Sequence, residues 1–149
     1  WDQSDKKQTQ NRRRFYLLGE SLGGMQIWDV RRAIQALRTL DINQKATVMM
    51  RGDNDSAALV MYASLFEDVT AIGLNSLAES DVESLPILNS SRFYSVDQIL
   101  AAAASRQRTM VNQIPADAFS FTRKTAALNQ WPKNDFLFLP AKSSEANDK

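Results

Sequence analysis

The sequence predicts an α/β fold, a three-layer αβα arrangement around a mostly parallel sheet of about four strands. Stretches with helical periodicity alternate along the chain with short apolar runs that suit buried strands, and most connections between them are short. Such alternation favours right-handed crossovers, which cover both faces of a parallel sheet with helices. The length of 149 residues and the apolar content of 44% suit one domain with a buried core.

The two ends of the chain are predicted to lie outside this domain, which spans residues 12–140. Residues 1–11 and 141–149 are polar, charged and aperiodic, so we expect a flexible segment at each end. The first dozen residues lack the apolar stretch of a signal peptide, and nothing in the sequence assigns a compartment. Because the chain does not begin with methionine, we expect it to be a piece of a larger protein.

The first half of the domain contains two predicted helices and two predicted strands. Residues 25–40 form an amphipathic helix, because apolar side chains recur at helical spacing on one stripe: Ile27, Val30, Ile34 and Leu37. A short apolar run at 46–50 suits a buried strand, and a turn at 51–55 leads from it into a helix at 56–66 that is apolar almost all round. Residues 69–74 form the second predicted strand.

The second half repeats the alternation after a longer connection at 75–94. A helix at 95–106 begins with a serine as its N-cap, and a strand at 109–114 ends before a proline. A helix at 118–130 and a strand at 135–139 complete the order. Sites in parallel α/β folds lie beyond the carboxyl ends of the strands, so we expect any site in the loops that follow the four strands.

The composition excludes several classes of site. The 18 basic and 17 acidic side chains leave a net charge of +1, so no overall field attracts nucleic acid or an anionic membrane, and the arginines at 12–14 are a solvated flank. Cysteine is absent, and the apolar runs are too short to span a membrane. Asp53 and Asp55 lack the glycine and distal glutamate of a calcium loop, so we predict no metal and no cofactor.

The stretch LLGESLGGM at residues 17–25 matches the Gly-x-Ser-x-Gly pattern of a nucleophile elbow, with Ser21 at the serine position. In this interpretation residues 13–18 are the strand before the elbow, although charged residues are unusual in a buried central strand. A Ser-His-Asp triad also needs a histidine, and the chain has none. The structural alternative is a glycine-rich loop in which Ser21 leads into the helix that follows.

A second pattern lies downstream of this stretch. The predicted helix carries a D-V-x-x-A-I-x-x-L spacing made by Asp29, Val30, Ala33, Ile34 and Leu37. A polar link at 43–45 and the strand at 46–50 follow it. On these residues, and on the order of elements across 14–140, the chain resembles the C-terminal half of the acetyl xylan esterase-like α/β-hydrolases, relatives of the dienelactone hydrolases.

This resemblance implies that the elbow lies at 51–56, between a strand and a buried helix, and not at Ser21. Asn54 then falls on the position of the nucleophilic serine and Ser56 on that of the final glycine. The position of the catalytic acid falls on Asp117, and the residues after the last strand offer no histidine. A carboxamide is no nucleophile, because its nitrogen lone pair is delocalised into the carbonyl.

The function that follows is a degenerate, non-catalytic domain of this hydrolase family, with half of the usual sheet. The exposed sheet edge would pair with the N-terminal remainder of the parent protein or with a homodimer partner, and a carbohydrate or an ester is the ligand that the resemblance implies. Two alternatives stay open. One is a serine esterase that uses Ser21 with a histidine supplied from elsewhere, and the other is a small doubly wound ligand-binding domain of the flavodoxin-like kind.

Overall fold

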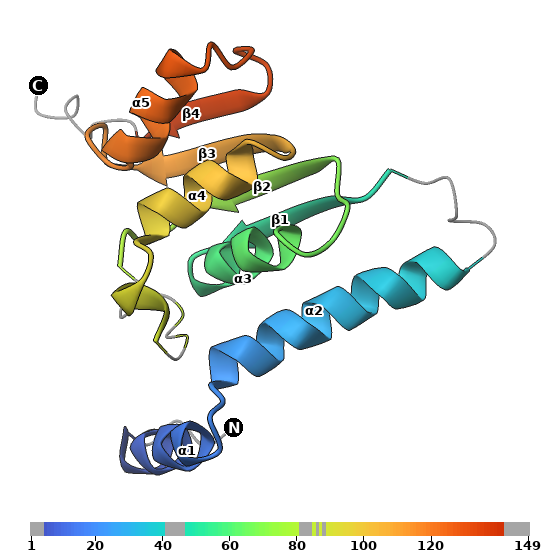
Figure 1. The fold of residues 1–149 in the computed structure, drawn as a ribbon, viewed down its shortest axis with the longest axis vertical. Helices are drawn as coiled ribbons and strands as arrows, with labels where there is room; N and C mark the ends of the chain where they lie inside the picture. Colours follow the sequence, from blue (N-terminus) through green and yellow to red (C-terminus); the bar gives the residue numbers. More distant parts are fainter. Residues whose placement is uncertain (1–4, 41–46, 81–84, 86, 88, 142–149) are drawn as a thin grey trace, which may run out of the picture.

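The computed structural model describes residues 5–40, 47–80, 85, 87 and 89–141. The helices in these residues are α1 (Asp5–Leu17), α2 (Leu22–Thr39), α3 (Asp55–Ser64), α4 (Val96–Ala104) and α5 (Ser120–Leu128), with a short 3-10 helix, η2 (Ser90–Arg92). The strands are β1 (Met49–Asp53), β2 (Ala71–Asn75), β3 (Arg108–Ile114) and β4 (Phe136–Pro140) (Figure 1).

The strands form one parallel sheet of four strands in the order β1-β2-β3-β4. This confirms the predicted α/β fold, in which helices pack against a four-stranded parallel sheet. The first strand differs in its bounds, because it ends at Asp53 and not at Met50. The residues expected to form a turn continue the ladder, with Arg51 opposite Gly73 and Asp53 opposite Asn75. The strand-to-helix turn is therefore confined to a single residue between β1 and α3.

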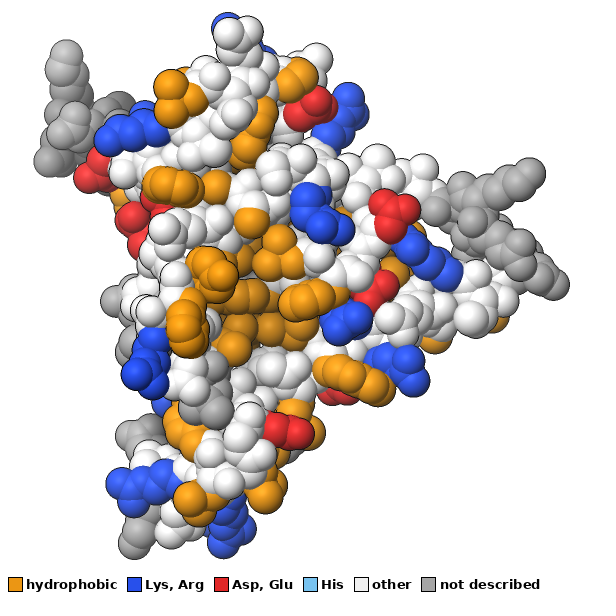
Figure 2. Space-filling view, viewed as in Figure 1, with side chains coloured by type: hydrophobic (Ala, Val, Ile, Leu, Met, Phe, Trp, Pro, Cys, Tyr) orange, Lys and Arg blue, Asp and Glu red, His pale blue; other side chains and the backbone are white. Residues whose placement is uncertain are grey.

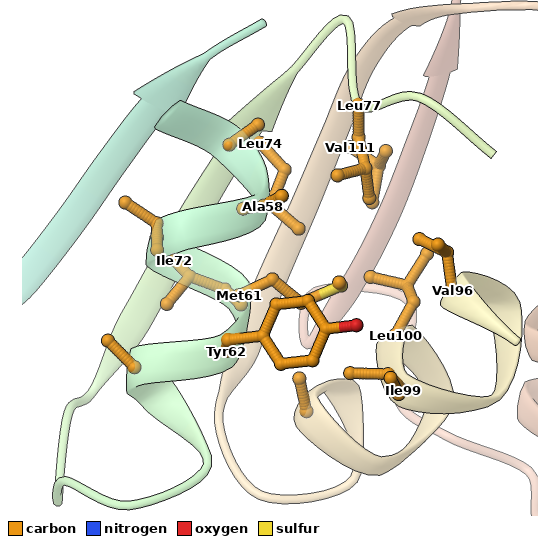
Figure 3. Packing of buried hydrophobic residues seen from close by; sticks show 14 of the residues in the cluster. Ala58, Met61, Tyr62, Ile72, Leu74, Leu77, Val96, Ile99, Leu100 and Val111 are labelled. Atoms are coloured by element: carbon orange, nitrogen blue, oxygen red, sulfur yellow. The ribbon is translucent and has the colours of Figure 1, made fainter. Parts of the chain in front are cut away.

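Helices α3, α4 and α5 lie on the same face of the sheet (Figure 1). Each of them connects one strand to its immediate neighbour, and right-handed connections in sequential order place every helix on the same side. The core lies between these helices and the sheet. In Figure 3 the side chains of Met61 and Tyr62 on α3 extend toward Leu100 on α4, while Leu74 and Val111 contribute fully buried side chains from the strands.

The opposite face of the sheet carries exposed apolar side chains. Successive residues of a strand point to opposite faces, and the outward-facing Met49, Met110 and Leu137 are 71%, 37% and 41% exposed. No described helix covers these three side chains. Within the described residues, the helices α3, α4 and α5 therefore cover only one face of the sheet.

Helix α1 is not expected from the sequence, which predicts a flexible segment over residues 1–11. The helix is polar and has no sustained apolar stripe, so apolar periodicity does not reveal it, although Lys, Gln and Arg are good helix formers. Its continuation through residue 17 also means that residues 13–18 do not form the strand that an elbow at Ser21 would require. Residues 1–4, the predicted link at 43–45 and the tail at 142–149 lie outside the described residues.

Helix α2 packs against α3 through the buried side chains of Ile27 and Ile34. A polar contact also holds its C-terminal half: Glu67 is buried, and its Oε1 accepts hydrogen bonds from Arg31 Nε at 3.0 Å and Gln35 Nε2 at 2.9 Å. The guanidinium of Arg31 also lies over the ring of Phe66, 4.8 Å from its centroid. These contacts hold α2 beside the helix that follows the strand-to-helix turn.

Candidate functional site at the carboxyl edge of the sheet

The turn between β1 and α3 holds Asn54 in a conformation that amino acids other than glycine rarely adopt. Its φ is 54° and its ψ is −124°. The conformation is secured on both sides, because the Asn54 N–H donates to the carbonyl oxygen of Asn75 and the Ala57 N–H donates to that of Asn54, each at 2.9 Å. Backbone strain of this kind costs about 1–3 kcal/mol and concentrates at functional sites. Asn54 is therefore the first residue of the candidate site.

The start of α3 lies directly against β1 because Gly52 has no side chain. A Cβ at this position would lie 2.3 Å from the carbonyl oxygen of Ser56 and 2.7 Å from the Cα of Ala57. The Ser56 hydroxyl closes the same turn, since its Oγ accepts from the Asp53 N–H and donates to the Asp53 carbonyl oxygen, each at 2.8 Å. The spacing Gly52-x-Asn54-x-Ser56 thus forms a sharp, closed strand-to-helix turn.

A ladder of polar side chains crosses three strands beside this turn. Asp53, Asn75 and Asn112 are opposite one another in the parallel register. Asn75 Nδ2 donates to Asp53 Oδ1, and Asn112 Nδ2 donates to Asn75 Oδ1 at 2.7 Å. The Oδ1 atom of Asn112 is buried and has no hydrogen-bond partner in the described part of the chain. The amide donors therefore all point toward Asp53, the residue before Asn54.

A positive φ recurs after each residue of this ladder. Ser76 follows Asn75 with φ 51°, and Gln113 follows Asn112 with φ 57°. The Ser76 N–H donates to the carbonyl oxygen of Asn112 at 2.9 Å, which repeats the contact of Asn54 one strand further on. The Ser76 hydroxyl lies 3.4 Å from Gln113 Oε1. Consecutive strands thus present the polar side chains of Asn54, Ser76 and Gln113 at one edge of the sheet.

Asp117 lies in the exposed turn that follows β3, at the same carboxyl edge as Asn54. The strands that precede the two residues, β1 and β3, are separated by β2, which corresponds to about 10 Å across the sheet. No hydrogen bond joins the two side chains in the described residues. The structure thus brings Asn54 and Asp117 to one edge, without the direct contact that a nucleophile and its positioning group would share.

Ser21 does not lie in a strand-to-helix turn. It is the N-cap of α2, in a loop that joins two helices, and its Oγ accepts a hydrogen bond from the Gly24 N–H at 3.0 Å. The residue is only 4% exposed. It borders a hollow of about 590 Å³ together with Glu20 and Asp29. The hydroxyl therefore caps a helix, as the structural alternative for LLGESLGGM predicts.

Asn75 and Asn112 are not among the site residues predicted from the sequence. Asn75 is the polar residue at the end of an apolar strand, and Asn112 follows the apolar Met110 and Val111 inside β3, so each interrupts an apolar run in the sequence. Their alignment with Asp53 depends on the strand order and register, so the ladder emerges only from the folded chain. Such polar residues in apolar runs predict separate site residues and not a continuous hydrogen-bonded ladder.

The remaining classes of site find no support within the described residues. No group of three or more His, Cys, Asp or Glu side chains there is arranged to hold a metal ion. None of the described helices has the length and apolarity that crossing a membrane requires. Comparisons with protein families, curated proteins and solved structures give no match to this chain.

Proposed function

We propose that this chain is a degenerate, non-catalytic α/β-hydrolase domain that resembles the acetyl xylan esterase-like enzymes and forms part of a larger protein. The observation that supports the proposal is the backbone of Asn54, which is held at φ 54° and ψ −124° in a sharp turn between a parallel strand and a helix. This is the position at which the resemblance expects a nucleophilic serine. The turn is kept while the residue on it cannot attack a carbonyl carbon.

The charges around Asn54 also oppose acyl transfer. Its two neighbours in the chain are Asp53 and Asp55, and Asp55 lies in the first turn of α3, where the helix N-terminus favours negative charge. The oxyanion of an acyl-transfer intermediate needs hydrogen-bond donors and positive potential at this place. A carboxylate already lies there, and the chain has no histidine to move the proton.

Hydrolysis of p-nitrophenyl acetate tests the proposal. We expect the rate with the intact chain to equal the buffer rate, and the Ser21→Ala and Asn54→Ala variants to give the same result. Labelling with a fluorophosphonate, which modifies activated serines, should likewise leave the chain unmodified. Turnover that disappears in Asn54→Ala would contradict the proposal.

An esterase that uses Ser21 is the second candidate, because Ser21 borders a hollow that also contains Glu20 and Asp29. The hydroxyl would first have to give up its hydrogen bond with the Gly24 N–H. Turnover and fluorophosphonate labelling that disappear only in Ser21→Ala would establish this candidate. Loss of the N-cap costs about 1 kcal/mol, so circular dichroism on the variant serves as the folding control.

As a retained binding function we propose a hydroxylated ligand at the carboxyl edge, of the carbohydrate or ester class that the resemblance implies. The exposed Asn54 and Gln113 offer amide donors and acceptors there, with the Ser76 hydroxyl between them. Titration with an acetylated xylo-oligosaccharide should shift the amide NMR signals of these three residues. Shifts confined to the Ser21 hollow would place the ligand elsewhere.

A further inference from the structure

The exposed face of the sheet contains a trough of about 330 Å³ that runs along β2. Its floor is formed by the small residues Ala71 and Gly73, and its apolar walls by Met49, Met110 and Leu137. Parallel sheets in proteins are covered on both faces, because their strands are apolar on both sides. Here the helices α3, α4 and α5 cover only the other face. The trough is thus an apolar centre, bordered by arginines, on the sheet face that no described helix covers.

None of the described residues requires a glycine at position 73. A Cβ there would find its nearest neighbours, Arg51 Cγ and Met110 Cε, at 3.7 and 3.9 Å, which is ordinary van der Waals contact. Glycine weakens a strand by about 0.5–1 kcal/mol relative to alanine, and a glycine in a strand often marks a bulge, a bend or a place where another chain or ligand approaches closely. The register is regular at Gly73, so the third of these applies to it best. Gly52, by contrast, is required by contacts within the chain. Gly73 therefore leaves the floor of the trough without a side chain.

The charged side chains that line the trough are both basic. Arg51 and Arg108 lie on either side of it, on β1 and β3. Each is paired with a carboxylate outside the trough: Arg51 with Asp53 at 3.6 Å and Arg108 with Asp135 at 3.2 Å. All four side chains are at least 45% exposed, and exposed pairs contribute at most about 1 kcal/mol. The two guanidinium groups are thus free to turn toward an acidic partner.

We propose that this trough docks an amphipathic helix from a partner polypeptide, with an apolar stripe bordered by Asp and Glu side chains. A small-residue floor lets a helix approach the sheet closely, and the walls match an apolar stripe. A five-residue strand is about 17 Å long, which corresponds to about 11 residues of helix. The two arginines would then meet the acidic borders of the stripe.

A second copy of this chain is a poorer occupant because of its charge. Three of the described helices carry several basic side chains, and Figure 2 shows blue side chains over each of them: α1 carries three arginines at 12–14, α2 carries Arg31, Arg32 and Arg38, and α5 carries Arg123 and Lys124. Placing any of them in the trough would bring like charges beside Arg51 and Arg108. The described basic helices of a second copy are therefore poorer occupants than an acidic helix, and the inference holds whether or not Asn54 is catalytically silent.

Fluorescence anisotropy with two synthetic helical peptides tests the proposal on the full chain. Both are 18-residue amphipathic helices with the same Leu and Ala stripe, bordered by Glu in one and by Lys in the other. We expect the Glu peptide to bind at least about tenfold more tightly than the Lys peptide. The double variant Arg51→Glu with Arg108→Glu should reverse this preference.

A substitution that fills the trough tests peptide binding separately from folding. Gly73→Val places a β-branched side chain on the floor, and such residues favour strands, so the fold should be kept while peptide binding is lost. The matched control is Leu128→Val, which changes an exposed apolar residue at the end of α5, away from the trough, and should leave binding unchanged. Circular dichroism and the unfolding midpoint verify that both variants are folded.

Three results would overturn the proposal. The first is a Glu peptide that does not bind, and the second is a Glu peptide that binds Gly73→Val as tightly as the original chain. The third is self-association: sedimentation that shows a dimer of the original chain and a monomer of Gly73→Val would make a second copy the occupant of the trough.

Discussion

At the scale of single residues, two glycines of the same sheet have opposite roles. Gly52 lets the helix begin against the strand, since a Cβ would lie 2.3 Å from the Ser56 carbonyl oxygen. Gly73 faces the open side of the sheet, where a Cβ would make ordinary contacts. The geometry of the candidate site therefore depends on the first glycine and is independent of the second.

This contrast predicts different costs for the same substitution. Gly52→Ala should lower the free energy of unfolding by about 3 kcal/mol, because the added methyl group displaces backbone atoms of α3. Gly73→Ala is the matched control and should raise it by about 0.5–1 kcal/mol, because alanine is favoured over glycine in a strand and the added Cβ meets only ordinary contacts. Urea denaturation of the two variants measures both values. Equal losses would show that the turn does not depend on the contact with Ser56.

The strain at Asn54 makes a separate prediction at this scale. Replacement by glycine, which adopts positive φ without a steric penalty, should raise the free energy of unfolding by about 1 kcal/mol. Asn54→Ala keeps a Cβ and should bring no such gain. The unfolding midpoint of each variant checks the prediction. A gain of equal size in Asn54→Ala would assign the effect to the amide group and not to the backbone.

At the scale of elements, helix α5 depends on a residue of α4 for its N-terminal cap. Phe119, at its N-cap position, has φ 53° and no side-chain cap. The carboxylate of Asp97 takes that role, since it accepts from the N–H groups of Phe121 and Thr122 at 2.8 and 2.9 Å and from the Thr122 hydroxyl at 2.6 Å. The cap therefore ties two neighbouring helices together and fixes the turn that carries Asp117.

Removal of this cap should be costly. Asp97→Ala leaves the buried Thr122 hydroxyl with only the Asp97 carbonyl oxygen as its partner and exposes two amide donors, so we expect a loss of about 2 kcal/mol in the free energy of unfolding. Asp117→Ala removes a carboxylate that is exposed to solvent and should stay within about 0.5 kcal/mol. Thermal unfolding of the pair measures the difference. A similar midpoint for both would mean that α5 does not use the Asp97 cap.

At the scale of the whole molecule, the sequence predicts the alternation of helices and strands and the place of Asn54 between them. These features depend on local apolar patterns, such as the run from Ser56 to Phe66. That the described helices cover only one face of the sheet cannot be predicted from these patterns. Met49 and Met110 belong to apolar runs that suggest burial on both faces. The sequential strand order, however, places α3, α4 and α5 on the same face. The polar ladder likewise requires the register, and α1 has no apolar stripe to reveal it.

This architecture predicts an uneven distribution of stability. Helix α3 and strands β2 and β3 contain most of the fully buried side chains, including Met61, Leu74 and Val111, so their amides should open only with the whole fold. The side chains described in α1 are exposed or half-buried, so its amides should exchange through local fraying. Hydrogen–deuterium exchange followed by mass spectrometry should show β3 exchanging at least about a thousandfold more slowly than α1. Equal protection of the amides of β3 and α1 would require α1 to be packed against a partner. Protection of α1 that is lost on dilution of the sample would identify that partner as a second copy of the chain.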